Sequence, residues 1–93
     1  MSTTKCICVW YDSVGTPGDP RWIVSVDEID SATHDTLITD TIRILPADAV
    51  EADAVEAGKR IAVERDLPLY QHEFDAGGHG LGNRHTLLQG VDQ

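Results

Sequence analysis

The sequence predicts an α+β fold: an antiparallel sheet of three to four strands, in the order β-β-β-α-β, with one amphipathic helix packed on one face. Three segments alternate apolar and polar residues with the period of a strand, and one later segment has the period of a helix. Turn-forming Gly, Pro, Asp and Ser separate these segments. The length of 93 residues fits one compact domain.

The first three strands follow each other closely. Residues 5–11 are β-branched or aromatic on both faces, as in a central strand buried on two sides. Residues 12–20 are rich in Gly and Pro and predict a hairpin loop. Residues 21–27 and 37–44 alternate as half-buried strands, so short links favour an antiparallel meander. In the third strand we expect three isoleucines on one face: Ile38, Ile42 and Ile44.

One helix follows the third strand. Asp48 can cap it, and Glu51 three residues later completes a capping box. At about 100° per residue, an apolar stripe forms along one side. Pro68 ends the helix, and residues 69–74 alternate as a fourth strand. The stripe predicted to face the sheet consists of Val50, Ala54, Ala57 and Ile61.

The domain is expected to span residues 1–75, followed by a Gly-rich, flexible tail at 76–93, with a short strand around residues 86–88 as an open alternative. Apolar runs stop well short of the ~20 residues that cross a bilayer, and the start lacks a signal-peptide pattern. Only two cysteines occur, which fits a reducing compartment. We therefore expect a cytoplasmic protein without membrane contact.

The charge is concentrated in one stretch. Residues 27–56 hold nine acids and a single base, Arg43, and so account for eight of the nine net negative charges. Such a surface repels phosphate and attracts basic protein surfaces. Direct nucleic-acid binding is not expected, because that affinity depends on Lys and Arg.

The charge predicts a non-enzymatic interaction protein whose negative face binds a basic partner, such as a nucleic-acid-binding protein. Phage-type inhibitors that mimic nucleic acid and antitoxin-like neutralisers are proteins of this kind. Two readings stay open beside it: the acids only stabilise the helix and keep the chain soluble, or the chain forms a homodimer. The predicted partner-binding residues are Asp27, Glu28, Asp30, Asp35, Asp48, Asp53 and Glu56.

A metal protein or small enzyme is the alternative from another class. Cys6 and Cys8 point to the same face of a strand, and His72, His79 or His85 could complete a zinc shell. Two strand rises of ~3.3 Å place the cysteines about 6.6 Å apart, which is too long for a disulfide and awkward for two ligands of one ion. The favoured expectation is buried structural cysteines, no metal and no cofactor.

Catalytic motifs are not expected either. A triad of Ser25, His34 and Asp35 can be written down, but its spacing indicates nothing specific. The acids at residues 27–30 lack the spacing and glycine of an EF-hand, and solvation is the favoured reading. The Gly-rich region lacks the lysine and following helix of a P-loop.

The segments 22–26, 52–62 and 69–72, in this order, resemble small βββαβ domains of the HicB-antitoxin type and related bacterial and phage proteins. The resemblance covers residues of roughly 5 to 75. It implies a role in blocking a toxin or another partner. HicB-type antitoxins normally add a DNA-binding segment, and this chain has no room for a helix-turn-helix and no evident basic strand. Operator binding is therefore not implied.

Overall fold

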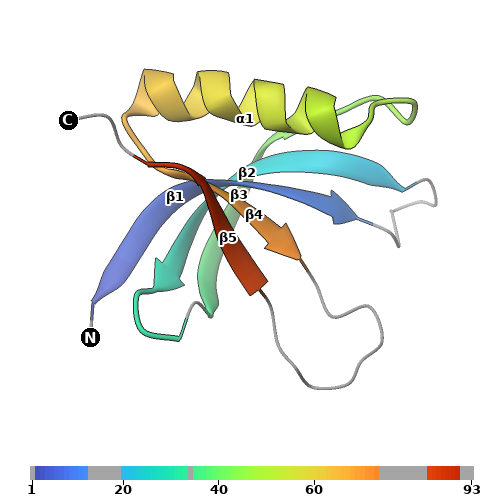
Figure 1. Ribbon diagram of the computed structural model, residues 1–93. Helices are drawn as coiled ribbons and strands as arrows, with labels where there is room; N and C mark the ends of the chain where they lie inside the picture. The colour runs from blue at the N-terminus through green and yellow to red at the C-terminus, as the bar shows by residue number, and fades with distance from the viewer. Residues whose placement is uncertain (1, 13–19, 34, 74–83, 91–93) are drawn as a thin grey trace.

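The computed structural model describes residues 2–12, 20–33, 35–73 and 84–90 (Figure 1). Within these ranges the chain forms one helix and five strands. In chain order they are β1 (Thr3–Asp12), β2 (Arg21–Asp30), β3 (Thr36–Ile44), α1 (Glu51–Arg65), β4 (Leu69–Glu73) and β5 (Arg84–Gln89).

The five strands form one mixed sheet in the order β3-β2-β1-β4-β5. The α+β class, the order of the first five elements and the single helix on one face are confirmed. The sheet itself differs from the prediction. After α1 the chain returns beside β1, so β4 pairs with it in parallel, whereas the other neighbours are antiparallel.

The sheet also continues past the expected domain boundary at residue 75. β5 pairs with β4 from Arg84 to Gln89, so this part of the predicted tail belongs to the sheet. The suggested short strand at residues 86–88 lies inside β5. Gly90, which follows β5, is also described. The other residues of the predicted tail, 76–83 and 91–93, lie outside the described residues.

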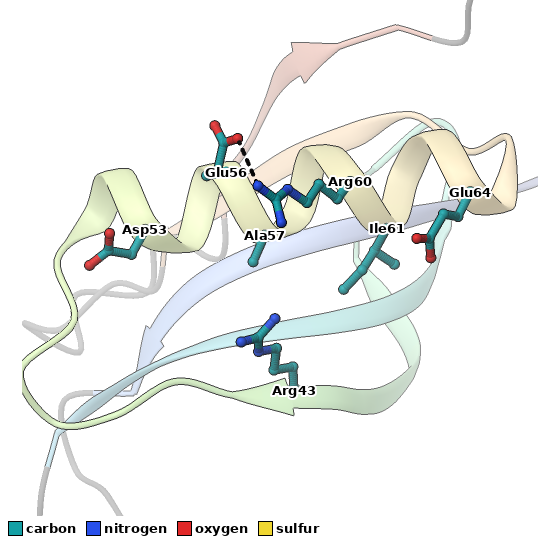
Figure 2. A pocket seen from close by; sticks show the side chains of 7 residues that line it. All are labelled: Arg43, Asp53, Glu56, Ala57, Arg60, Ile61 and Glu64. Carbon is teal, nitrogen blue, oxygen red and sulfur yellow. Dashed lines mark ion pairs between the residues drawn. The ribbon is translucent and has the colours of Figure 1, made fainter.

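The pairing of β3 with β2 shifts register twice, between Val24 and Ser25 and between Glu28 and Ile29, and the first shift changes the faces of β3. Val24 pairs with Arg43 and Ser25 with Thr41, so Ile42 is the extra residue of a bulge. Paired residues share a face of a sheet, and Arg43 therefore projects toward α1 (Figure 2). Ile44 pairs with Ile23 on the other face. The expectation of three isoleucines on one face is wrong because a bulge reverses the alternation beyond it.

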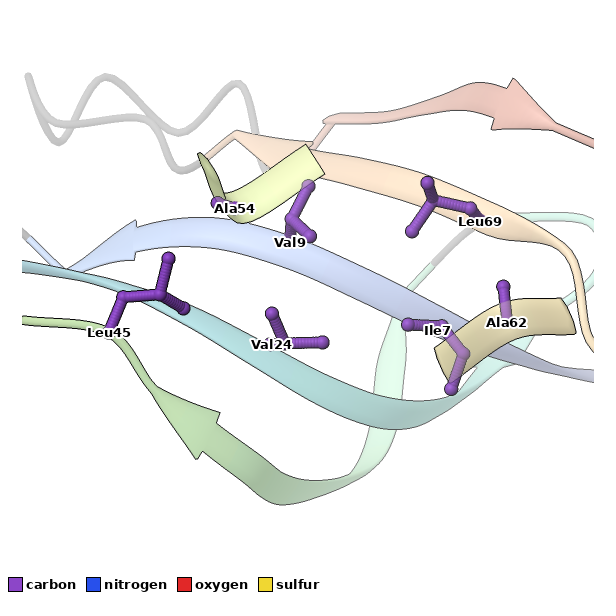
Figure 3. Packing of buried hydrophobic residues seen from close by; sticks show 7 residues of the cluster. All are labelled: Ile7, Val9, Val24, Leu45, Ala54, Ala62 and Leu69. Atoms are coloured by element: carbon purple, nitrogen blue, oxygen red, sulfur yellow. The ribbon is translucent and has the colours of Figure 1, made fainter. Parts of the chain in front are cut away.

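The main core lies between α1 and the sheet (Figure 3). As predicted, β1 is central, and its residues 6–9 are buried on both faces. The smaller cluster on the face away from α1 comprises Cys6, Cys8 and Ile29. The helix-side core consists of Ile7, Val9, Val24, Leu45, Ala54, Ala62 and Leu69.

The helix begins later than predicted. Its N-cap is Val50, whose backbone N–H donates to Asp53 Oδ2 at 3.0 Å. Asp53 thus takes the place expected for Glu51, and Asp48 precedes the helix as an exposed residue. The helix ends at Arg65, and its C-cap Asp66 adopts the left-handed conformation (φ 56°), two residues before Pro68.

Small residues form the buried side of α1: Ala54, Gly58 and Ala62. The predicted stripe is rotated, since Val50 is 59% exposed and Ala57 and Ile61 are only half-buried. A Cβ atom on Gly58 would lie 2.8 Å from both Val9 and Leu69 side-chain atoms. Gly58 therefore sets how closely the helix approaches the sheet.

Gly58→Ala is expected to lower the free energy of unfolding by up to about 2 kcal/mol. Overpacking of a tight core costs about 1 to 3 kcal/mol, and the gain in helix propensity, about 1 kcal/mol, offsets only part of it. Urea denaturation followed by circular dichroism measures the difference. Ala52→Gly, at an exposed position of the same helix, calibrates the propensity effect. A Gly58→Ala protein more stable than the parent would contradict the packing described here.

Candidate functional site

Four acids cluster around the start of α1. Asp48, Glu51, Asp53 and Glu56 are all exposed. Glu51 and Asp53 lie in the first helical turn, where carboxylates interact favourably with the helix dipole. Glu56 lies 3.8 Å from Arg60, but both side chains are about two-thirds or more exposed, so this ion pair contributes little. Asp48, Asp53 and Glu56 of this group belong to the predicted partner-binding residues, whereas Glu51 is not among them.

The other predicted acids lie at the opposite end of β3. Glu28 accepts a hydrogen bond from Thr3 at 2.8 Å. Asp30 Oδ1 accepts from the backbone N–H groups of Ala32 and Thr33 at 2.8 and 2.9 Å and so stabilises the β2–β3 turn. β3 has nine residues, which at ~3.3 Å each span roughly 30 Å. The structure therefore divides the predicted acidic face into two groups, one at each end of β3.

Asp27 belongs to neither group. Its side chain is 1% exposed and lies on the face of the sheet away from α1, opposite Cys6 in the neighbouring strand. A partner at the surface has no access to it, so we leave Asp27 out of the acidic surface.

A groove of about 440 Å³ runs between α1 and β3 (Figure 2). Asp53, Glu56 and Glu64 line it from the helix, together with Arg60, and Arg43 faces them from β3. A smaller pocket of about 280 Å³ adjoins it, where Asp48 is also part of the wall. Arg43 reaches this groove only because of the bulge at Ile42, and the sequence carries no signal for that bulge.

β3 itself is an exposed edge. Within the described sheet it pairs only with β2, and α1 packs over β1, β2 and β4. Three large aliphatic side chains of β3 are half or more exposed: Leu37, Ile38 and Ile44. Edge strands offer unpaired backbone N–H and C=O groups to another chain, and proteins usually cover or charge them. An edge of this kind is suited to pairing with an added strand.

A second group of polar side chains is buried on the face away from α1. Cys8 of β1, Asp27 of β2 and His85 of β5 have donor atoms that all lie within 4.8 Å of one another. Ser25 Oγ donates to Asp27 Oδ1 at 2.7 Å, and Trp10 Nε1–H donates to Ser25 Oγ at 3.1 Å. These contacts place five polar side chains in one buried network.

Two further side chains border this network. Cys6 Sγ lies 3.6 Å from Cys8 Sγ, and both thiols are free. The side chains thus lean together, and the 6.6 Å spacing expected from the backbone overstates the distance between the sulfur atoms. The ring of His72 stacks on that of His85, with centroids 4.1 Å apart. His79, the third predicted zinc ligand, lies outside the described residues.

The environment of Cys8 does not favour a reactive thiolate. The hydrogen bond with Cys6, then burial, then the nearby Asp27 raise the pKa of the Cys8 thiol far above its ordinary value. A nucleophilic cysteine requires the opposite shift. The hypothetical Ser25–His34–Asp35 triad finds no support among the described residues: Ser25 contacts Asp27, Asp35 is exposed beyond the β2–β3 turn, and His34 is not described.

The tryptophans pack beside the sheet on opposite faces. Trp22 joins the helix-side core and its ring lies 5.3 Å from that of Tyr11, whereas Trp10 joins the other cluster.

No helix in the described part of the chain is both long and apolar enough to cross a membrane.

Comparison with known proteins gives no match to a family model, to a curated protein or to a solved structure. The resemblance to HicB-type domains thus stays an expectation from sequence. The function has to be inferred from the surface and the buried cluster themselves.

Proposed function

We propose that the chain is a non-enzymatic interaction protein that binds a basic, extended segment of a partner protein along the α1–β3 groove and the β3 edge. The observation that carries this proposal is the coincidence of an exposed apolar edge strand with a groove whose wall holds three carboxylates beside two arginines, Arg43 and Arg60. Neither feature alone would specify a partner, but together they fit a segment that alternates apolar and basic residues.

Each feature contributes a different part of the recognition. The β3 edge supplies backbone hydrogen-bond groups to an added strand, which gives affinity with little dependence on sequence. Ile38 and Ile44 offer apolar contact on opposite faces of that strand. Asp53, Glu56 and Glu64 on the facing helix favour Lys or Arg in the partner. The net charge of −9 adds long-range attraction for a basic protein.

We further propose that the partner is a nucleic-acid-binding protein. A basic surface of this kind is common among proteins that grip nucleic acid, so the chain would act as an inhibitor or neutraliser of such a protein, as phage inhibitors and antitoxins do. Self-pairing through two β3 edges is the competing use of the same strand. Two copies would bring two acidic grooves together, and their repulsion disfavours this arrangement.

A designed peptide tests the proposal directly. The probe is a fluorescent nine-residue peptide alternating Lys and Val, and fluorescence anisotropy measures its dissociation constant at low and high salt. We expect Glu56→Lys to weaken binding about five- to tenfold, since exposed charge contacts contribute up to about 1 kcal/mol each. Asp35→Lys makes the same charge change at the other end of β3 and should alter binding less than twofold. Higher salt should weaken binding of the parent.

Two outcomes would overturn the proposal. If both variants bind equally weakly, overall charge and not the groove attracts the peptide. If a peptide N-methylated along one edge binds as well as the unmodified one, the β3 edge does not pair with it. Gel filtration at several concentrations tests self-pairing through two β3 edges. A chain that dimerises in this way would elute as a dimer and release monomers when the peptide is added.

A further inference from the structure

We propose that the buried polar cluster on the face of the sheet away from α1 binds a zinc ion through Cys8, Asp27 and His85. The site is separate from the α1–β3 groove, which lies on the other side of the sheet. It does not depend on the proposed interaction function.

Geometry is the first support. The three side chains come from β1, β2 and β5, and their donor atoms lie within 4.8 Å of one another. Strand pairing sets this arrangement: Cys8 pairs with Ser25 two residues from Asp27, and His85 pairs with His72 on β4, which itself pairs with β1. All three side chains are at least nine-tenths buried, with exposures of 0%, 1% and 8%. Ligands on a rigid sheet need only small side-chain movements to close on an ion.

The carboxylate of Asp27 is the second, independent support. Oδ1 accepts the hydrogen bond from Ser25, but Oδ2 is fully buried and has no hydrogen-bond partner among the described residues. An unpaired buried carboxylate oxygen is costly, and such groups call for an explanation such as a bound ion. A cation at the centre of the cluster would satisfy this oxygen.

The combination of donors selects the metal. Zinc accepts thiolate sulfur, imidazole nitrogen and carboxylate oxygen in one tetrahedral shell, whereas calcium and magnesium require oxygen ligands. One thiolate and one carboxylate also neutralise the two positive charges, which suits a buried site. A water molecule can complete the tetrahedral shell, as in zinc sites that have three protein ligands.

The surrounding residues hold the ligands in place. The chain of hydrogen bonds from Trp10 through Ser25 to Asp27 fixes the orientation of the carboxylate. His72, stacked on His85, limits the rotation of that imidazole ring. Residues of this kind, which orient a ligand without touching the ion, commonly raise metal affinity.

The test uses two titrations of the metal-free full chain. Calorimetry measures the binding of zinc chloride, and absorption spectroscopy measures the binding of cobalt chloride. We expect one equivalent of zinc to bind, and the cobalt complex to show tetrahedral bands with a sulfur-to-metal charge-transfer band. Cys8→Ser, Asp27→Asn and His85→Gln should each weaken zinc binding by at least about 100-fold, since even loss of a supporting residue costs about 10- to 100-fold. Asp40→Asn, an exposed acid of β3, is the matched control and should bind as the parent does.

Several results would overturn the site. Absence of zinc binding by the folded parent, or zinc affinity unchanged in Asp27→Asn and His85→Gln, would each do so. Circular dichroism checks that every variant is folded. If a variant does not fold, the cobalt spectrum of the parent decides, because a spectrum without the sulfur charge-transfer band excludes Cys8 as a ligand.

Discussion

Replacing Leu69 with alanine is expected to lower the free energy of unfolding by about 3 kcal/mol. Leu69 is fully buried at the start of β4, where it pairs with Ile7 and lies against Gly58 of α1. Removal of a buried leucine typically costs about 2 to 5 kcal/mol through lost apolar burial and the cavity left behind. The loss should be near the middle of this range, because Leu69 connects the helix to the only parallel strand pair in the described sheet.

Thermal and urea denaturation measure this effect. In a domain of this size each kcal/mol lowers the melting temperature by about 4 to 8 °C, so a drop of more than about 10 °C is expected. Leu87→Ala is the matched control, since Leu87 lies on the adjacent strand β5 but is 55% exposed, and it should cost less than about 1 kcal/mol. Equal losses for the two variants would show that β4 is not packed under α1 as described.

The order of the elements could be predicted because each has a local signal. Residues 5–11 are apolar on both faces, and β1 is indeed the central strand. The Pro68 break and the amphipathic segment before it place α1 to within three residues at its start. These features depend on the period of apolar residues and on turn chemistry, both of which lie within a few residues of the chain.

Features that depend on distant pairing could not be predicted. The alternation of β3 indicates a strand, but only the register against β2 shows the bulge that turns Arg43 toward α1. β5 follows a Gly-rich segment and is six residues long, so its sequence alone does not distinguish it from a loop. Its inclusion in the sheet is determined by β4, whose free edge it covers.

The candidate sites show the same division. The concentration of acids in residues 27–56 is visible in the sequence, but the nine-residue length of β3 separates them into two groups. The period-two rule places Asp27 on the opposite face from Glu28, and only the structure shows that this face is buried there. Cys8 and His85 are 77 positions apart, and their proximity results from the strand order. Both residues are among the zinc ligands considered from the sequence, but no spacing motif could show that they lie close together.

Replacing Asp27 with asparagine is expected to have opposite effects on stability and on metal binding. In the metal-free protein, Oδ2 of this carboxylate is buried without a hydrogen-bond partner among the described residues. An amide of the same shape still accepts the hydrogen bond from Ser25 and carries no charge, and burying it costs less than burying a carboxylate. We therefore expect Asp27→Asn to raise the free energy of unfolding by about 1 to 3 kcal/mol in the presence of a chelator.

With zinc added, the order should reverse. A ligand that binds only the folded state stabilises it by about 2.7 kcal/mol at a concentration 100 times its dissociation constant, and this gain should appear in the parent but not in Asp27→Asn. Urea denaturation of both proteins, with chelator and with zinc chloride, measures the four values. Asp40→Asn should follow the parent within about 0.5 kcal/mol in both conditions, because Asp40 is exposed. If Asp27→Asn instead destabilises the metal-free protein, the carboxylate stabilises the fold by itself, and its burial would no longer indicate a cation.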